Sequence, residues 1–266
     1  MVRCPQLTRT GSGTVDSFSP DAECVGSARL RLCIDLSIEK TNKYASRESG
    51  DTAELVERPA GGLSVVVVDG QGSGQAAKTL SLLISSKAVA LLKEGVRDGA
   101  VARAAHDFLF AYRHGKVSAT LDILSVDLVS RSVVVTRNAD APLVIVRAGD
   151  TSIVEPTAGP IGRYHRTKPT ITELPMTADL RVLLCTDGIP AAGVRDGKGR
   201  FDVAEFVRES GLSDKQASEL ASCVLEEAIR RDNGRPGDDM AVVALRLTDH
   251  EDERLIRRMT ATVPLP

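Results

Sequence analysis

Four aspartates stand where an apolar segment meets a glycine, and these are Asp51, Asp69, Asp187 and Asp238. Carboxylates gathered in an apolar setting repel one another, so such a cluster is stable only when cations neutralise it. Mg²⁺ and Mn²⁺ are hard cations that prefer oxygen ligands of this kind. The four aspartates therefore predict a site for divalent metal ions, provided that the fold brings them together.

Of the four segments, the one around Asp69 is the most specific indication of a metal site. A β-branched run at 63–68 ends at Asp69, and Gly70 begins a glycine-rich loop. Glycine lets the backbone turn tightly, so the Gly70 carbonyl could also face a cation. An ordinary Asp-Gly turn explains the same residues. Recurrence of the pattern at the other three acids favours the metal site, because strand ends commonly present functional groups.

The same loop also permits a nucleotide-binding interpretation. Residues 72–79 differ from the P-loop pattern Gly-x-x-x-x-Gly-Lys-[Ser/Thr] only at Ala77, and Lys78 would then contact phosphate. A dinucleotide fingerprint is excluded, because Gln75 replaces its last glycine. The chain lacks the regular strand and helix alternation that builds a parallel sheet. A P-loop-like NTPase therefore stands as an alternative.

The elements that must position these acids follow from the apolar periodicity. A period of two, or a short apolar run, predicts strands at 28–38, 63–68, 119–128, 132–138, 143–146, 180–186 and 241–247. A helical period predicts helices at 75–94, 98–114, 201–209 and 214–231. Strands gathered between helix pairs predict antiparallel sheets flanked by helices.

The sequence predicts one main domain with polar ends. Residues 1–28 are polar and aperiodic, which predicts a flexible arm, and 249–266 form a charged tail. The segment between them, 29–248, holds the motifs. A chain of 266 residues with 42% hydrophobic content is long enough for one substantial core.

Composition excludes several classes of function. The 34 basic and 36 acidic residues form no basic stripe, and only 3% of residues are aromatic, so nucleic acid is not expected as a ligand. No apolar stretch approaches the roughly 20 residues of a membrane helix, and no signal-peptide pattern begins the chain. Five cysteines without a Cys-x-x-Cys pair argue against a disulfide framework and a zinc site. We expect a cytoplasmic protein that does not bind membranes.

The motifs occur in an order that resembles the PPM family of metal-dependent Ser/Thr protein phosphatases, and within it the bacterial branch typified by stage II sporulation protein E. The resemblance covers roughly residues 30–248. The motifs are Ser49-Gly50-Asp51, Asp69-Gly70-x-Gly-x-Gly74, Asn138-Ala139-x-x-Pro142, Gly159-Pro160-Ile161-Gly162, Thr186-Asp187-Gly188 and Gly237-Asp238-Asp239-Met240.

The resemblance implies an α+β fold, a four-layer αββα sandwich of two central antiparallel sheets flanked by helix pairs. It also implies a centre of two Mn²⁺ or Mg²⁺ ions at one edge. By position, Asp69 would bridge the two metals and Gly70 would contribute its carbonyl. Asp187 and Asp238 would hold one ion, and Asp51 would bind or orient water on the other.

The activity implied is hydrolysis of phosphoserine or phosphothreonine by a water activated between the two metals. By analogy, the substrate is a phosphorylated anti-anti-sigma-type regulator in a partner-switching pathway. A catalytically silent binding module of the same fold is the rival, although the complete acidic set argues against it. Regulation is expected from a partner, from dimerisation or from the helices after Gly74.

The sequence departs from the family pattern at several positions. Gln71 stands where some members carry a histidine that could act as general acid, so we expect slow turnover or a metal-bound water as the acid. Asp140 replaces the usual glycine after Asn-Ala and is expected in a hairpin turn. Arg47 is the candidate for binding substrate phosphate. Of the adjacent acids, Asp238 is preferred to Asp239, because the family ligand is the first of that pair.

Overall fold

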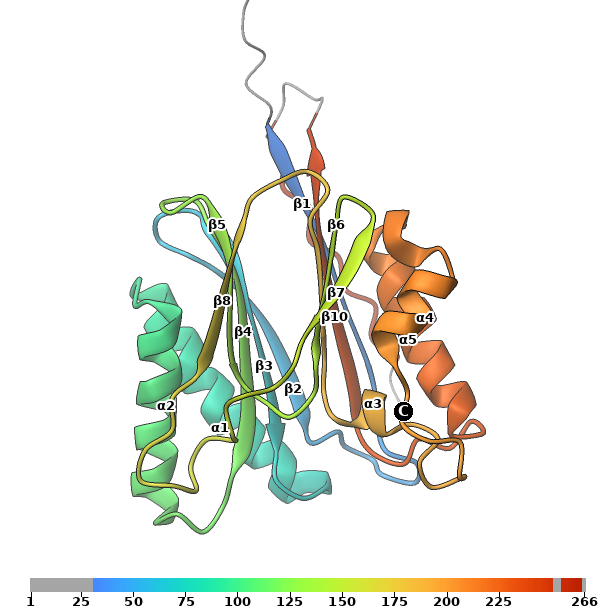
Figure 1. Cartoon of the computed structure of the whole chain (residues 1–266). Coiled ribbons are helices and arrows are strands. Elements are labelled where there is room, and N and C mark those ends of the chain that lie inside the picture. The colour runs from blue at the N-terminus through green and yellow to red at the C-terminus, as the bar shows by residue number, and fades with distance from the viewer. Residues whose placement is uncertain (1–30, 251–254, 265–266) are drawn as a thin grey trace, which may run out of the picture. The chain divides into compact units, whose positions relative to one another are not determined.

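The computed structural model describes residues 31–250 and 255–264. The predicted arm at 1–28, and the start of the first predicted strand, lie outside the described residues. Within them the chain forms two antiparallel sheets of five strands, with helices on the outer face of each (Figure 1). The predicted αββα sandwich is confirmed. No helix in the part of the chain that the structure describes is long and apolar enough to cross a bilayer.

The two sheets have different strand orders. The sheet that begins with β1, called here the β1 sheet, has the order β1 (Leu32–Thr41), β10 (Met240–Asp249), β9 (Arg181–Cys185), β6 (Leu143–Arg147) and β7 (Asp150–Val154). The β2 sheet has the order β2 (Asp51–Glu57), β3 (Gly62–Gly70), β4 (Ala119–Asp127), β5 (Ser132–Asn138) and β8 (Thr170–Pro175).

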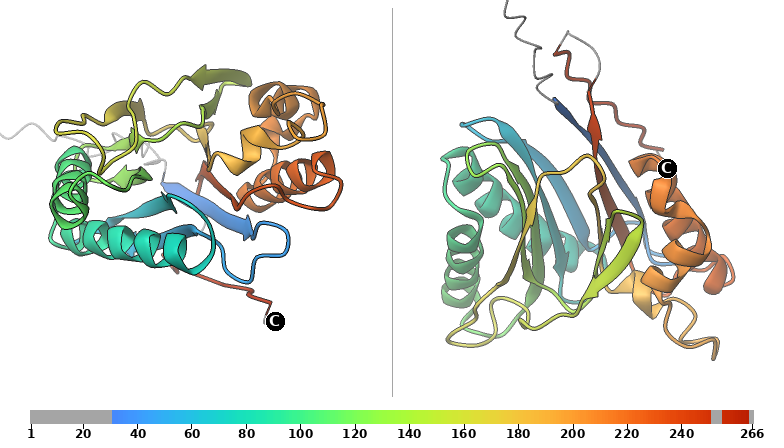
Figure 2. Two further views of the ribbon diagram at one scale, coloured as in Figure 1. Left: turned by 90° about the horizontal axis from the view of Figure 1, so that it is seen from below. Right: turned by 45° about the horizontal axis from the view of Figure 1, so that its top comes forward.

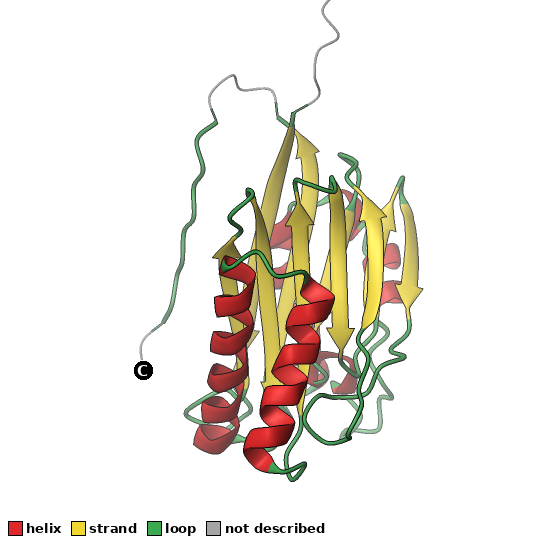
Figure 3. Ribbon diagram, turned by 90° about the vertical axis from the view of Figure 1, so that its left-hand side faces the viewer, coloured by secondary structure: helices red, strands yellow, loops and turns green. Residues whose placement is uncertain are grey.

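Helix pairs cover the outer faces. Helices α1 (Gly74–Lys93) and α2 (Asp98–Arg113) lie against the β2 sheet, as Figure 3 shows with both helices in front of the strands. The β1 sheet is covered by α3 (Gly188–Ala191), α4 (Val203–Glu209) and α5 (Ala217–Arg231), joined by a short 3-10 turn at Leu212–Asp214. The view from below in Figure 2 shows the two helical groups on opposite sides of the paired sheets.

The core explains why the central strands are continuously apolar. In β3, Val65 and Val67 pack between the two sheets, whereas Val66 and Val68 pack against α1 and α2. Both faces of the strand are buried, so both sets of side chains are apolar. Asp69 continues the Val65 and Val67 alternation, and this places it on the face that looks toward the β1 sheet.

Three strands were missed by the periodicity: β2, β7 and β8. Strand β8 lies at the edge of its sheet and alternates between half-buried and exposed positions, so it lacks a strong apolar signal. Strand β2 is also an edge strand and carries acidic residues at Asp51, Glu54 and Glu57. Edge strands leave backbone groups unpaired on one side and often carry charged side chains, which weakens the apolar signal here.

The P-loop alternative is wrong. All strand pairs in the described residues are antiparallel, so the parallel sheet that such NTPases need is absent there. Lys78 lies within α1 and donates hydrogen bonds to β2, to the Asp51 carbonyl at 3.0 Å and to Thr52 Oγ1 at 2.9 Å. The match to the P-loop pattern is therefore a feature of a helix packed on a sheet.

The turn that contains Asp140 is not a hairpin, which corrects the prediction. It leads from β5 in the β2 sheet to β6 in the β1 sheet. A buried ion pair braces it, since Arg137 Nε lies 2.9 Å from Asp122 Oδ1 and the same guanidinium donates to the Ala141 carbonyl. Asn138 Nδ2 donates to the Gly159 carbonyl at 2.9 Å. These bonds fix the crossing between the sheets.

Candidate metal centre

Strand register places two of the predicted acids side by side. In the antiparallel pair of β2 and β3, Asp51 and Asp69 are direct cross-strand partners. Side chains at such positions lie on the same face of a sheet. Asp51 is buried, with 1% of its surface exposed, at the start of β2. The two carboxylates thus share the edge of the β2 sheet that faces the β1 sheet.

Thr186 brings the second sheet to Asp51. Its hydroxyl donates to Asp51 Oδ2 at 2.8 Å and accepts a hydrogen bond from the Ala241 amide at 2.8 Å. The Thr186 amide donates in turn to the Ala241 carbonyl at 3.0 Å. Because Asp187 follows directly, the end of β9 presents its acid beside the Asp51 and Asp69 pair. The sequence contained Thr186 in a motif, but gave no sign of this role.

The adjacent acids Asp238 and Asp239 have different environments. Asp239 is buried, and its two carboxylate oxygens accept from the amides of Lys43 and Gly50, each at 2.8 Å. The Asp238 side chain is 47% exposed, with Oδ1 lying 4.0 Å from Lys43 Nζ. Asp239 is thus occupied in holding two loops together, whereas the half-exposed Asp238 accepts at Oδ1 from the Asp239 amide at 3.0 Å and has Oδ2 left for a cation. This difference supports the choice of Asp238 as the ligand.

Two glycines permit the close approach of the acid-bearing loops. A Cβ atom at Gly70 would collide with the carbonyl of Ala77 in α1, and one at Gly188 would collide with the carbonyl of Asp239. Only glycine lets a backbone pass so near another backbone. The Asp-Gly pairs therefore serve packing in addition to any role toward a metal.

The carboxylates act on one another electrostatically. Burial raises the pKa of Asp51 to about 7, with further contributions from Asp239 and Asp187 that the Thr186 hydrogen bond opposes. Burial and the charge of Asp51 raise the pKa of Asp69 to about 8. The pKa of Asp187 is also raised, first by burial and then by Asp238. Ionised together, these groups are unfavourable in this setting without a compensating positive charge.

The donor set fits a hard divalent cation. Asp51 Oδ1 is buried and has no hydrogen-bond partner, which is costly for a carboxylate oxygen unless a cation or proton meets it. All the acids supply oxygen, the element that Mg²⁺ and Mn²⁺ prefer. Across residues 31–250 and 255–264, no three His, Cys, Asp or Glu side chains already form a group that could hold a metal. The predicted acids meet at one edge, and their ligand geometry stays a prediction.

Two lysines that the sequence analysis did not relate to the acids lie against Asp51. Lys40 Nζ in β1 donates to the Asp51 carbonyl at 3.2 Å, and Lys78 Nζ in α1 donates to the same oxygen. Burial lowers the pKa of Lys78, and the nearby charge of Lys40 adds to this effect. The two lysines thus link β1 and α1 to the backbone of β2 at Asp51. No motif marks Lys40, and the near match to the P-loop pattern gave Lys78 a different role.

Arg47 and Gln71, the remaining candidates, make no direct contact with the acids in the described residues. Arg47 is exposed, and its carbonyl accepts from Asn42 Nδ2 at 3.1 Å. No contact in the described part of the chain joins its guanidinium to the acids, so its role toward phosphate stays a prediction. Gln71 Oε1 accepts from the Ser118 amide at 2.8 Å, which fixes this side chain in the turn after β3.

The comparison of sequences identifies the family. The family model for Stage II sporulation protein E (SpoIIE) matches residues 59–248. The chain belongs to the SpoIIE family. It is 23% identical over 222 residues to Stage II sporulation protein E of Priestia megaterium, a match that covers 80% of this chain and 36% of that protein. This SpoIIE-family chain thus spans about a third of the length of that relative.

Solved structures show the same fold. The PP2C phosphatase domain of SpoIIE from Bacillus subtilis, solved with a fragment of its regulatory domain, superposes with a TM-score of 0.71 at 22% identity, covering 83% of this chain and 65% of that one. The catalytic domain of the serine threonine protein phosphatase PstP, in complex with 2 manganese ions, gives a TM-score of 0.64 at 18% identity, covering 82% and 100%. The SpoIIE-family chain therefore has the PP2C fold.

Proposed function

We propose that this chain is a metal-dependent protein serine/threonine phosphatase. The observation that carries the proposal is the cross-strand pair of Asp51 and Asp69, in which Asp51 is buried, accepts from Thr186 of the other sheet and has no hydrogen-bond partner at Oδ1. Membership of the SpoIIE family and the PP2C fold support the same activity. The substrate would be a phosphoserine or phosphothreonine of another protein.

The metal would be held by oxygens of five residues. Asp69 would be shared by the two ions, and Gly70 would contribute its carbonyl. Asp187 and Asp238 would hold one ion, and Asp51 would bind or orient water on the other. Two Mn²⁺ or Mg²⁺ ions, when bound, would neutralise these carboxylates and acidify a water for in-line attack on phosphorus. A structural relative holds two manganese ions, which supports this choice of metal.

The chain's own residues prepare the site. The Thr186 hydroxyl fixes one oxygen of Asp51 and leaves the other without a partner. Lys40 and Lys78 fix the Asp51 backbone by donating hydrogen bonds to its carbonyl. Preorganised groups of this kind lower the cost of binding a charged ligand, because little rearrangement is needed.

The leaving serine oxygen needs a proton, and position 71 does not supply one. Gln71 has no ionisable proton, and its side-chain oxygen is already an acceptor for Ser118. A serine alkoxide is a poor leaving group unless it is protonated. We therefore expect slower turnover than in relatives that carry an acid at this position.

The biological substrate is proposed by analogy. A phosphorylated regulator of the anti-anti-sigma type, acting in a cytoplasmic partner-switching pathway, fits membership of the SpoIIE family. Formation of a homodimer is one way in which the activity of such an enzyme could be regulated. The catalytically silent binding module stays the rival function, and it predicts the same fold without turnover.

Phosphate release tests the activity directly. Wild-type protein is assayed with p-nitrophenyl phosphate and a phosphoserine peptide, with Mn²⁺ or Mg²⁺ and with EDTA, beside an ATP hydrolysis assay. We expect metal-dependent release that Asp69→Asn abolishes and that Asp107→Asn, an exposed acid on α2, leaves unchanged. No release with either metal, while Mn²⁺ still raises the melting temperature, would favour the silent module.

A further inference from the structure

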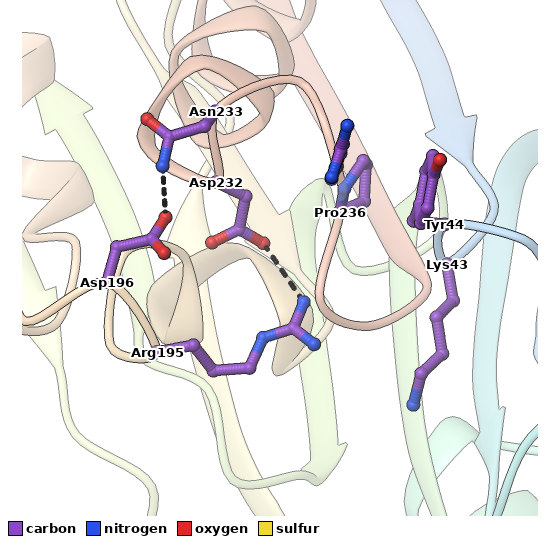
Figure 4. A pocket seen from close by; sticks show the side chains of 8 residues that line it. Lys43, Tyr44, Arg195, Asp196, Asp232, Asn233 and Pro236 are labelled. Atoms are coloured by element: carbon purple, nitrogen blue, oxygen red, sulfur yellow. Dashed lines mark hydrogen bonds and ion pairs between the residues drawn. The ribbon is translucent and has the colours of Figure 1, made fainter.

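A cavity of about 650 Å³ opens beside the candidate metal centre (Figure 4). Three turns build it: one after β1, one after α3 and one after α5. Its lining residues are Lys43, Tyr44, Arg195, Asp196, Asp232, Asn233, Arg235 and Pro236. None of these residues belongs to the motifs that predicted the metal site.

Lys43 connects this cavity to the acids. Its Nζ lies 4.0 Å from Asp238 Oδ1, and its backbone amide donates to Asp239 Oδ1 at 2.8 Å. One wall of the cavity is therefore joined directly to the loop that presents Asp238. A chain segment lying in the cavity would continue within a few residues to the candidate metal centre, at about 3.3 Å per extended residue.

The cavity is preformed by hydrogen bonds between its turns. Asp232 Oδ1 accepts from the Gly193 amide at 2.7 Å, and Oδ2 accepts from the Gly237 amide at 2.6 Å. The Tyr44 amide donates to the Pro236 carbonyl at 2.8 Å. All three turns are thus tied to one another, so a ligand would meet walls that are already in place.

The two acidic side chains of the cavity bond to neighbouring turns. Besides its two amides, Asp232 lies 4.0 Å from Arg195 Nη2, and Asp196 accepts from Asn233 Nδ2 at 2.6 Å, as the dashed lines in Figure 4 mark. Both oxygens of Asp232 accept hydrogen bonds, whereas Asp196 accepts at Oδ2. The two acids thus act as structural parts of the wall.

The cavity is lined by three basic and two acidic side chains, so its lining carries a net positive charge, and Arg195 and Lys43 each lie 4.0 Å from one acid. Arg235 lies over the Tyr44 ring, 5.3 Å from its centroid, and no carboxylate in the described part of the chain pairs with its guanidinium. The side chain of Arg195 is 62% exposed, and that of Lys43 is 38% exposed. Tyr44 is itself 58% exposed and offers an apolar ring beside these cations. The cavity therefore suits an anionic ligand that also carries apolar groups.

We propose that this cavity docks an acidic segment of the phosphoprotein substrate, whose Asp or Glu side chains flank the phosphorylated residue. The inference rests on the proposed phosphatase function. Guanidinium groups match carboxylates in a planar, two-bond geometry, and the Tyr44 ring gives the peptide stem a surface. The cations come from three separate turns around a cavity much larger than one phosphate, which favours an extended acidic segment over a free anion.

The test compares two phosphoserine peptides of equal length, one flanked by Glu and the other by Lys. The kcat/KM of each is measured for wild-type protein, for Arg235→Ala and for Arg97→Ala, an exposed arginine preceding α2. We expect wild-type protein to prefer the Glu peptide by roughly three- to ten-fold, a preference that Arg235→Ala lowers and Arg97→Ala keeps. High salt should weaken it, because the pairs are exposed.

Other results would refute the proposed docking or would separate it from catalysis. Equal kcat/KM values in wild-type protein, or a preference that survives in Arg235→Ala, would overturn it. If wild-type protein hydrolyses neither peptide nor p-nitrophenyl phosphate, the proposed function fails, and fluorescence anisotropy with the labelled peptides then decides docking alone. Selective binding of the Glu peptide that Arg235→Ala removes would uphold docking without catalysis, and no selectivity would refute it.

Discussion

The Thr186 hydroxyl of the β1 sheet donates to Asp51 Oδ2 of the β2 sheet at 2.8 Å and accepts from the Ala241 amide at the same distance. One side chain thus orients an acid and satisfies a buried amide across the space between two sheets. Thr186→Val keeps the shape of the side chain but removes both hydrogen bonds. We expect it to lower the free energy of unfolding by about 1–3 kcal/mol, since two buried polar groups lose their partner.

The same variant should reduce phosphatase activity, because Asp51 is no longer held by its neighbour. Urea unfolding and hydrolysis of p-nitrophenyl phosphate measure the two effects. Thr186→Ser retains the hydroxyl and serves as the matched control. Equal stability and activity in the Val and Ser variants would show that the bond between the sheets contributes nothing measurable.

The adjacent acids Asp238 and Asp239 should respond differently to replacement by asparagine. Asp238→Asn should lower kcat/KM by at least about 100-fold with little change in unfolding, because it removes a candidate ligand from a half-exposed position. Asp239→Asn places an NH₂ group against one of the amides of Lys43 and Gly50, so it should cost about 1–3 kcal/mol of stability. Kinetics and urea unfolding on both variants check this. The reverse pattern would make Asp239 the ligand.

Gly188 should not tolerate a methyl group. A Cβ atom there would collide with the Asp239 carbonyl, whereas a Cβ atom at Gly159 would meet no heavy atom within 4 Å. Gly188→Ala should therefore destabilise the protein by roughly 1–3 kcal/mol as the backbone shifts to relieve the overlap. Thermal unfolding of the two alanine variants gives the comparison, and a matching loss in Gly159→Ala would contradict this explanation.

Stability of the metal-free protein should fall as the pH rises. Burial raises the pKa of Asp51 to about 7 and that of Asp69 to about 8 from an ordinary value of 3.8, so the folded state binds protons more tightly than the unfolded state. The resulting stabilisation is complete below about pH 4 and is lost as the pH rises through about 8. Melting temperatures in EDTA between pH 5 and 9 measure this slope.

Mn²⁺ should flatten that slope, because a bound cation replaces the protons. Asp69→Asn should flatten it in EDTA, since it removes one of the two titrating groups, and Asp107→Asn should keep it. A melting temperature in EDTA that rises between pH 6 and 8 would mean that the acids are not buried together in the metal-free protein.

The amino-acid sequence by itself determined the layers and was enough to predict the candidate acids. Apolar periodicity identified α1 and α2 to within one residue at each end, because each buries a broad apolar face against a sheet. The ordered motifs predicted the candidate acids Asp51, Asp69, Asp187 and Asp238, because each lies at a local junction that Gly marks. These are properties of short segments, and short segments are visible in sequence.

Tertiary structure alone decided which groups meet. Thr186 and Asp51 are 135 positions apart, and Gly50 and Asp239 are 189 apart, so no local pattern relates them. Strand register and loops from different elements decide three further features. These are the different environments of Asp238 and Asp239, the lysines that bond to the Asp51 carbonyl, and the basic cavity at Arg235. Register is set by the burial of alternate side chains over whole sheets, and for that reason these contacts emerge only when the two sheets are packed together.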